Sequence, residues 1–237
     1  MLNTSESFRE ILYRRYRSEL GENCVGSPDN PYLRRLARTH FPTERISRIC
    51  DLGCGTGALL RILQDLGYRN LEGVDRSPFQ VEHRLSGAVR LGDGLNCLEG
   101  KDPGSLEVIV TFDVIEHLTR SELLEWAESV SRVLAPGGRW IVHAPNAAGI
   151  FGGRIRYGDL THEICFTGQS LRQLASVAGF KAVQVYEDKP TVHGVLSGVR
   201  RLVWEVGRLP FILLLASETG EWRNCVLSQN LTAVFYK

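Results

Sequence analysis

The chain has 237 residues, of which 43% are hydrophobic and 23% are charged, and its formal net charge is +1. A chain of this length can bury a large core without disulfides or a structural metal. The balanced charge gives no general attraction to nucleic acid or to an anionic membrane. We therefore expect no nucleic-acid partner and at most peripheral membrane contact.

Residues 1–42 are predicted to form a helical cap. Apolar side chains recur at helical spacing in two stretches, which contain Phe8, Ile11, Leu12 and Tyr16, and then Leu33, Leu36 and Ala37. The segment between these stretches, GENCVGSPDNP, is rich in turn-forming residues and is predicted to be a loop.

Two features of the sequence predict a cytoplasmic location. The first residues, MLNTSESFRE, lack the basic start and the apolar run of a signal peptide. The six cysteines contain no C-x-x-C pair and no Cys/His spacing of a zinc knuckle, so we expect reduced thiols and no metal site.

From Ile46 onward, apolar strands alternate with helices. The predicted strands are ISRICDL, NLEGVD, AVRLGD, VIVTFD, RWIVHAP, KAVQVYE and LTAVFY. The predicted helices are ALLRILQDLG, one that starts at Ser77-Pro78, one from Ser121 to about Leu134 that APGG ends, and one from Ser170 to Ala178. This alternation indicates a single α/β domain with a parallel sheet covered on both faces.

The stretch from Leu202 to Ala216, LVWEVGRLPFILLLA, is strongly apolar but is interrupted by Glu205, Arg208 and Pro210. It is shorter than the roughly 20 apolar residues that a membrane-spanning helix needs. We predict that the stretch is buried or lies at an interface, with burial favoured.

A glycine-rich turn follows the first strand of the alternating series. Residues 51–57 have the sequence DLGCGTG, in which glycine permits a ligand to approach the backbone closely. The N–H groups at the start of the next helix favour an acidic or polar ligand group. Asp75 ends the second strand, where a carboxylate can accept hydrogen bonds from both hydroxyls of a ribose. The spacing G-x-G-x-G differs from the dehydrogenase fingerprint, and there is no P-loop sequence.

Successive motifs occur in the order found in a known family. They are DLGCGTG, Asp75, LGDG with Asp93, FDVIEHL and LAPGGRWIVHAPN, within residues 46–146. In this order they resemble the class I S-adenosylmethionine-dependent methyltransferases. The resemblance implies a Rossmann-like, seven-stranded, mostly parallel sheet with an antiparallel last strand, helices on both faces and S-adenosylmethionine as cofactor. It also implies a cofactor-binding core at 46–146 and an acceptor-side half at 147–237 with a helical insertion at 191–229.

The resemblance assigns roles to individual positions. It implies that the methionine part of the cofactor contacts Asp51, Gly53 and Gly55, and that the ribose contacts Asp75. It implies that the adenine lies near Arg76, Asp93 and Gly94. The methyl-donor pocket would be lined by Phe112, Asp113, Val114 and His117. Structural alternatives stay open for some of these residues. Asp75 could cap the following helix and Asp93 could be a turn residue. Asp113 and Glu116 could be ordinary helix-start acids, and His117 could be structural.

Transfer to a hydroxyl group benefits from a general base, for which histidine is the usual residue. The candidates for acid–base catalysis are His162, His143 and Glu163, with His193 behind them. For acceptor binding the candidates are Tyr157, Asp159 and His162, in the segment YGDLTHE. The surrounding FGGRIRYGDLTHEICFT and the later SQNL resemble bacterial members that act on small molecules, including sugars of surface polysaccharides.

Two further regions receive predictions. Tyr13, Tyr16 and Arg17 are predicted to pack on the domain or to close over the cofactor as a lid. The insertion at 191–229, with Trp204, Phe211 and Trp222, is predicted to shape the acceptor pocket or a homodimer face.

The favoured function is methyl transfer to an oxygen of a small-molecule acceptor, such as a sugar or a glycan-pathway intermediate. A quinone-ring O-methyltransferase at the membrane is the main alternative, because of the apolar 202–216 stretch. A nucleic-acid methyltransferase is disfavoured because no N/D-P-P-Y/F motif and no Pro-Cys pair occur. A protein methyltransferase and a non-catalytic cofactor-binding module remain as further alternatives.

Overall fold

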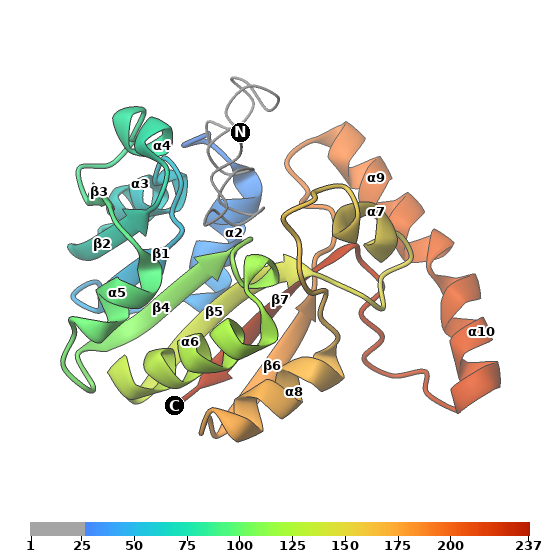
Figure 1. Cartoon of the computed structure of the whole chain (residues 1–237). Helices are drawn as coiled ribbons and strands as arrows, with labels where there is room; N and C mark the ends of the chain where they lie inside the picture. Colours follow the sequence, from blue (N-terminus) through green and yellow to red (C-terminus); the bar gives the residue numbers. More distant parts are fainter. Residues whose placement is uncertain (1–26) are drawn as a thin grey trace, which may run out of the picture.

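The computed structural model describes residues 27–237, and in this part of the chain the strands form one seven-stranded sheet in the order β3-β2-β1-β4-β5-β7-β6 (Figure 1). The strands are β1 (Arg48–Leu52), β2 (Asn70–Asp75), β3 (Val89–Leu91), β4 (Leu106–Phe112), β5 (Leu134–Pro145), β6 (Ala182–Glu187) and β7 (Asn230–Tyr236). Strands β1 to β5 pair in parallel, and β7 is antiparallel to both β5 and β6. The predicted Rossmann-like, mostly parallel sheet with an antiparallel last strand is confirmed.

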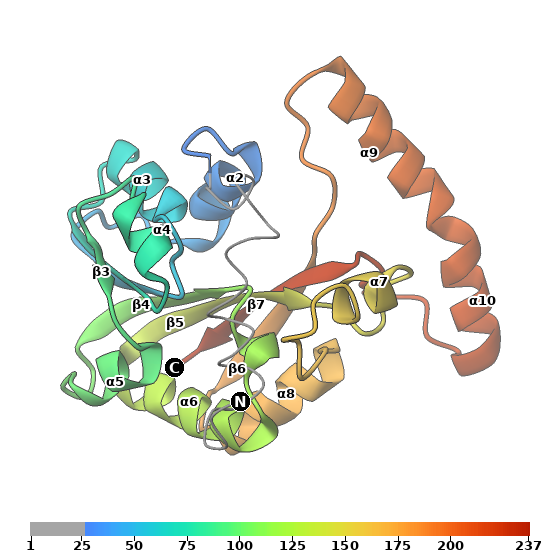
Figure 2. The ribbon, with the colours of Figure 1, turned by 45° about the horizontal axis from the view of Figure 1, so that its top comes forward.

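Helices cover both faces of the sheet. The helices of the described residues are α2 (Pro31–His40), α3 (Ala58–Asp65), α4 (Pro78–Glu82), α5 (Gly94–Glu99), the short 3-10 helix η3 (Ile115–His117), α6 (Arg120–Val133), α7 (Gly152–Arg156), α8 (Gly168–Val177), α9 (Val195–Gly207) and α10 (Leu209–Thr219). Figure 2 shows α2, α3 and α4 on one side of the sheet and α5, α6 and α8 on the other.

The core divides into two apolar clusters, one on each face of the sheet, because successive strand residues point to opposite sides. In β5, Trp140 and Val142 belong to the cluster beneath α6 and α8, whereas Ile141 between them belongs to the cluster beneath α2 and α3. All three side chains are almost completely buried. This placement leaves the carboxyl ends of the parallel strands for polar side chains and ligands.

The predicted helix from Ser121 to Leu134 corresponds to α6, which starts at a capping box. The Thr119 side chain accepts a hydrogen bond from the Glu122 N–H, and the Glu122 carboxylate accepts one from the Thr119 N–H. The end of this helix differs from the prediction, because APGG lies inside β5 instead of between helix and strand. The register between β4 and β5 is irregular there, which accommodates these residues within the strand.

Two N-terminal predictions have different outcomes. The second predicted helix is present as α2, with the Asn30 side chain accepting hydrogen bonds from the N–H groups of Tyr32 and Leu33. The first predicted helix, with Phe8, Ile11 and Leu12, and the proposed lid lie outside the described residues.

The favoured prediction for Leu202–Ala216, burial within the domain, is wrong, whereas the alternative of an interface stays a prediction. The insertion forms α9 and α10, which stand away from the sheet as one helical arm (Figures 1 and 2). The exposed fractions of Leu202, Leu213 and Leu214 are 64%, 69% and 67%. An apolar run indicates a surface that avoids water but not whether the same chain covers it. Within residues 27–237 no helix combines the length and the apolar character needed to cross a membrane.

Gly94 is required by packing, since a Cβ at this position would lie 2.3 Å from the Trp126 ring. Trp126 is 5% exposed and cannot move into solvent. We expect Gly94→Ala to lower the free energy of unfolding by about 1–3 kcal/mol, the usual cost of an overpacked core. Urea denaturation of the ligand-free protein measures this change. Gly87→Ala is the matched control, because nothing lies within 4 Å of its Cβ. Equal midpoints for the two variants would contradict the packing role.

Candidate active site

The glycine loop after β1 is held against the end of β2. Gly53, Gly55 and Gly57 have positive φ angles of 76°, 54° and 77°, which side-chain-bearing residues rarely adopt. The Gly55 N–H donates a 2.7 Å hydrogen bond to Oδ2 of Asp75. The Ser77 N–H donates a 2.8 Å bond to the other carboxylate oxygen of Asp75. Asp75 therefore closes the loop, and its carboxylate faces the loop backbone.

Asp51 is a buried carboxylate beside this loop. Its side chain is 2% exposed, and Oδ1 has no hydrogen-bond partner among residues 27–237. Burial, together with the nearby charge of Asp75, raises the pKa of Asp51 to about 7. A buried polar atom without a partner is costly, so the position favours a ligand that donates hydrogen bonds or carries positive charge.

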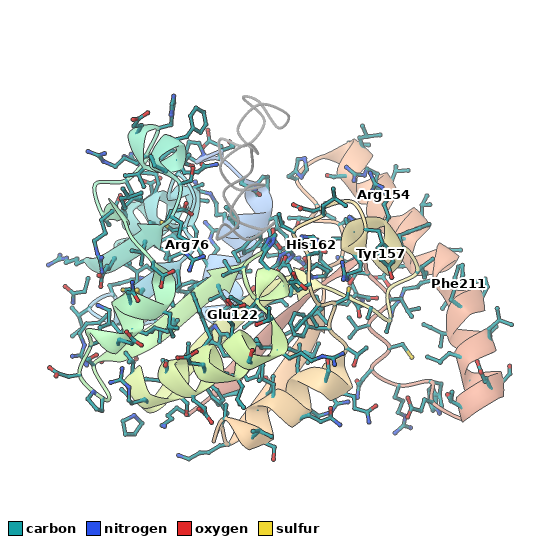
Figure 3. The ribbon with its side chains drawn as sticks, in the orientation of Figure 1. Arg76, Glu122, Arg154, Tyr157, His162 and Phe211 are labelled. Carbon is teal, nitrogen blue, oxygen red and sulfur yellow. The ribbon has the colours of Figure 1, made fainter. Side chains whose placement is uncertain are left out.

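The ends of β2 and β3 are joined by an ion pair between Arg76 and Asp93. Asp93 also caps α5 by accepting a 2.9 Å hydrogen bond from the Asn96 N–H. Burial alone would raise the pKa of Asp93, but the hydrogen bonds from Asn96 and Arg76 lower it below its usual value. Arg76 lies at the surface above this edge of the sheet (Figure 3). The predicted adenine contacts thus lie together, and Gly94, which follows Asp93, packs against α6.

His143, a candidate general base, is held between two carboxylates. Its Nδ1 lies 2.5 Å from Oδ1 of Asp113, and its Nε2 lies 2.7 Å from Oδ2 of Asp188. The ring of Phe112 stacks on the imidazole with 4.1 Å between centroids. Burial by itself would lower the pKa of His143, but the two carboxylates outweigh burial and raise the pKa to about 10. At neutral pH this imidazole is protonated, which argues against His143 as the base.

The sequence did not identify two partners of His143, Asp188 and Tyr32. The Tyr32 hydroxyl donates a 2.7 Å hydrogen bond to Asp188, which directly follows β6. The position of Asp188 at the carboxyl end of a predicted strand was a sequence signal that could have identified it. No sequence feature near Tyr32 indicates that it is a partner of Asp188. These contacts join α2 to the ends of β5 and β6.

A second polar cluster contains Glu116, His117 and His162. One ligand-type atom from each residue lies within 4.8 Å of the other two, and Nε2 of His162 is 4.0 Å from Oε1 of Glu116. The His117 and His162 rings meet edge to face with 4.8 Å between centroids. Burial raises the pKa of Glu116 to about 8, with a further contribution from Asp113. Burial and the neighbouring His162 lower the pKa of His117.

The segment with the predicted acceptor contacts packs against this cluster. The N–H of Glu163 donates a 2.7 Å hydrogen bond to the carbonyl oxygen of Glu116. Asp159 accepts hydrogen bonds from the N–H and the hydroxyl of Thr161, at 2.8 and 2.6 Å. Tyr157 is 79% exposed, and the Glu163 side chain is also exposed (Figure 3 shows Tyr157 beside α7). The structure thus joins His117 and His162, which the sequence assigned to different roles, whereas His193 lies exposed just before α9.

Comparisons with known proteins find similar sequences among curated methyltransferases. A ubiquinone biosynthesis O-methyltransferase of Cupriavidus pinatubonensis is 26% identical over 106 residues, which is 42% of this chain and 41% of that protein. A probable S-adenosylmethionine-dependent methyltransferase of Mycolicibacterium smegmatis is 29% identical over 136 residues, 56% of this chain and 51% of that protein. The chain therefore spans about half the length, or less, of these two curated relatives.

The fold is shared with solved structures at low sequence identity. A SAM-dependent methyltransferase of Archaeoglobus fulgidus is 19% identical with a TM-score of 0.66, covering 91% of this chain and 97% of that chain. Phosphoethanolamine N-methyltransferase 2 of Haemonchus contortus, solved with S-adenosyl-L-methionine, is 18% identical with a TM-score of 0.61, covering 98% and 59%. A family model described as a methyltransferase domain matches residues 13–185, which is more than half of the chain. The chain therefore belongs to the methyltransferase domain family and has the fold of the class I S-adenosylmethionine-dependent enzymes.

Proposed function

We propose that this protein transfers a methyl group from S-adenosylmethionine to an oxygen atom of a small-molecule acceptor. The observation that supports the cofactor most directly is the buried, partnerless Oδ1 of Asp51 beside the glycine loop. The ammonium group of the cofactor's methionine part would compensate this carboxylate. Asp75 has further lone pairs that the ribose hydroxyls can use.

The bound cofactor supplies a methyl group on a sulfonium, which is already a good leaving group. The protein's task is to orient the acceptor and to exclude water, and such positioning can contribute on the order of 7–11 kcal/mol. The His143 imidazolium fixes Asp113 at the end of β4 through their 2.5 Å contact. We assign removal of the acceptor's proton to the cluster of Glu116, His117 and His162.

The acceptor is proposed to lie against the 157–163 segment, with Tyr157, Asp159 and His162 as contacts. An oxygen acceptor is consistent with the relatives named as ubiquinone biosynthesis O-methyltransferases in Cupriavidus and Caulobacter. A sugar or a glycan-pathway intermediate fits the same polar loop. Action in the cytoplasm and the absence of a nucleic-acid partner remain parts of this proposal.

Cofactor affinity is expected to depend on pH through Asp51. Its pKa of about 7 means that the carboxylate is ionised above this pH and neutral below it. Calorimetric titration with S-adenosylmethionine should therefore show affinity that falls up to about tenfold for each pH unit below 7. Asp51→Asn should bind weakly with a flattened pH profile, and NAD should not bind the wild type. Tight, pH-independent binding by the variant would remove Asp51 from the site.

Turnover is expected to depend on His162. His162→Ala should lower kcat on the order of 10²-fold because the acceptor's proton is removed less effectively. The affinity for S-adenosylmethionine should not change, since His162 is outside the glycine loop. His193→Ala is the control, because His193 is an exposed histidine and should have normal turnover. If His162→Ala has full activity on a sugar or phenol acceptor, His162 has a structural role and is not the base.

A second candidate, a quinone-ring O-methyltransferase at the membrane, is favoured by the helical arm. Apolar side chains of α9 and α10 are exposed, and a pocket of about 430 Å³ lies between these helices and the start of α7. Trp222, at 60% exposure, and Arg223 follow α10, and aromatic and basic residues are the types enriched at membrane interfaces. A lipid surface is the occupant that this combination supports.

The arm is expected to bind lipid vesicles. In co-sedimentation with anionic phosphatidylglycerol vesicles, the wild type should pellet, and the double variant Leu213→Glu, Leu214→Glu should bind at least about tenfold more weakly. Ile46→Glu provides a control at a residue that is 73% exposed and outside the arm. If the wild type stays in the supernatant, the membrane candidate is excluded. If the wild type forms a dimer and the double variant does not, the arm binds a second copy of the chain.

A further inference from the structure

The geometry points to a divalent metal site formed by Glu116, His117 and His162. Glu116 and His117 belong to η3, directly after β4, and His162 belongs to the loop that follows α7. Their ligand-type atoms lie within 4.8 Å of one another. Two imidazoles and one carboxylate form a common donor set for first-row divalent cations. The sequence alone indicated no metal site, because His162 lies 45 positions after His117 and the three residues match no metal-binding spacing.

The two histidines, His117 and His162, form hydrogen bonds of the kind that metal-binding histidines form through their second ring nitrogen. Nδ1 of His162 lies 3.0 Å from the carbonyl oxygen of Ile155, which can only accept, so this nitrogen carries the proton. The Thr161 hydroxyl donates to Asp159 and therefore accepts from Nδ1 of His117 at 2.8 Å. An imidazole that holds a single proton, on Nδ1, has its lone pair on Nε2. Metal-binding histidines usually donate their other N–H to a carbonyl or to a hydrogen-bonded carboxylate system in this way.

The third ligand is a carboxylate with an unused oxygen. Glu116 is 1% exposed, and its Oε2 has no hydrogen-bond partner among the described residues. A cation would compensate it. Another group of possible ligands, Cys50, Glu72 and Cys97, differs in this respect. There Lys101 and Arg90 already form ion pairs with Glu72, which leaves no comparable need for a metal.

The distances indicate which movement a cation would require. Metal–nitrogen and metal–oxygen bonds of about 2.0–2.2 Å place neighbouring ligand atoms roughly 3–3.5 Å apart. The 4.0 Å separation between His162 Nε2 and Glu116 Oε1 is slightly longer. Small side-chain rotations would close it, since the Glu163 N–H already holds the loop to the Glu116 carbonyl oxygen at 2.7 Å. The two imidazole ligands favour transition-metal ions such as Co²⁺ or Zn²⁺ over Mg²⁺, and the carboxylate is also suited to Mn²⁺.

The bound cation would also define the acceptor, a step that rests on the proposed function. Three protein ligands leave open coordination positions for an exogenous molecule. An acceptor with two neighbouring oxygens, such as a catechol or a vicinal diol, could fill two of them. The cation would lower the pKa of the hydroxyl that receives the methyl group. His162 would then promote proton loss as a ligand of the cation. The hydroxyl would release its proton to water, the new O–CH3 bond would form, and the S–CH3 bond of the donor would break.

Metal binding by the full chain tests the proposal without any cofactor or acceptor. After treatment with EDTA and its removal, the protein is titrated with Mn²⁺, followed by the electron paramagnetic resonance of free Mn²⁺. Co²⁺ absorption in the visible range provides a second readout that reports nitrogen ligands directly. The wild type should bind a single equivalent, and Glu116→Gln and His162→Ala should each bind at least about tenfold more weakly. Glu116→Gln preserves the shape of the side chain, so it is the variant expected to disturb the fold least.

Three further variants serve as controls for metal binding. Glu72→Gln and His193→Ala should bind like the wild type, and Thr161→Val should bind more weakly because it no longer orients His117. No binding by the wild type, or equal binding by Glu116→Gln and His162→Ala, would overturn the metal site. If the protein binds metal but EDTA does not change the rate of catechol methylation, the proposed role of the cation in acceptor binding is wrong. Failure of the proposed function would instead be seen as absent binding of S-adenosylmethionine.

Discussion

The contact of the His143 imidazolium with Asp113 and Asp188 is the interaction on which the site depends. It joins the ends of β4, β5 and β6 through two short charge-assisted hydrogen bonds. Asp113 has a φ of 55°, an unusual conformation for a residue with a side chain. The bond to His143 and the 3.1 Å hydrogen bond from the Asp113 N–H to the His143 carbonyl oxygen hold it there. This turn directs the chain into η3 and so places Glu116 and His117.

Three largely buried acids among residues 27–237, Asp188, Asp51 and Glu116, fall into two groups with different functions. Asp188 is compensated by His143 and Tyr32, and these partners help to lower its pKa although burial alone would raise it. Asp51 and Glu116 each retain a buried oxygen without a partner among the described residues, and burial raises the pKa of both. A paired acid stabilises the framework, whereas an uncompensated acid stores a cost that a ligand can relieve. The second group therefore indicates where ligands bind.

The sequence predicted the part of the fold that local signals encode. Strand-turn-helix order and the glycine loop were sufficient to place Asp51, Asp75 and Asp93 at neighbouring strand ends, because parallel strands present their carboxyl ends at the same edge. The partnership of Tyr32 with Asp188 could not be predicted, since 156 positions separate them. His143 was a plausible base by residue type, but its two carboxylate partners come from other elements. Its protonation state is therefore a property of the fold.

The arm shows a different limit of sequence analysis, because an apolar composition predicts that a helix face is covered but not which surface covers it. Its root is fixed in place: Arg208 pairs with Glu187 at the end of β6 at 3.0 Å, and Lys189 pairs with Glu205 at 3.0 Å. The Arg208–Glu187 pair is mostly buried, so its separation would leave charges uncompensated. The direction of α9 is thus set by the same strand end that carries Asp188. Exposed apolar surfaces commonly mark interaction sites, and the two ion pairs at the root hold this one in a defined orientation relative to the end of β6.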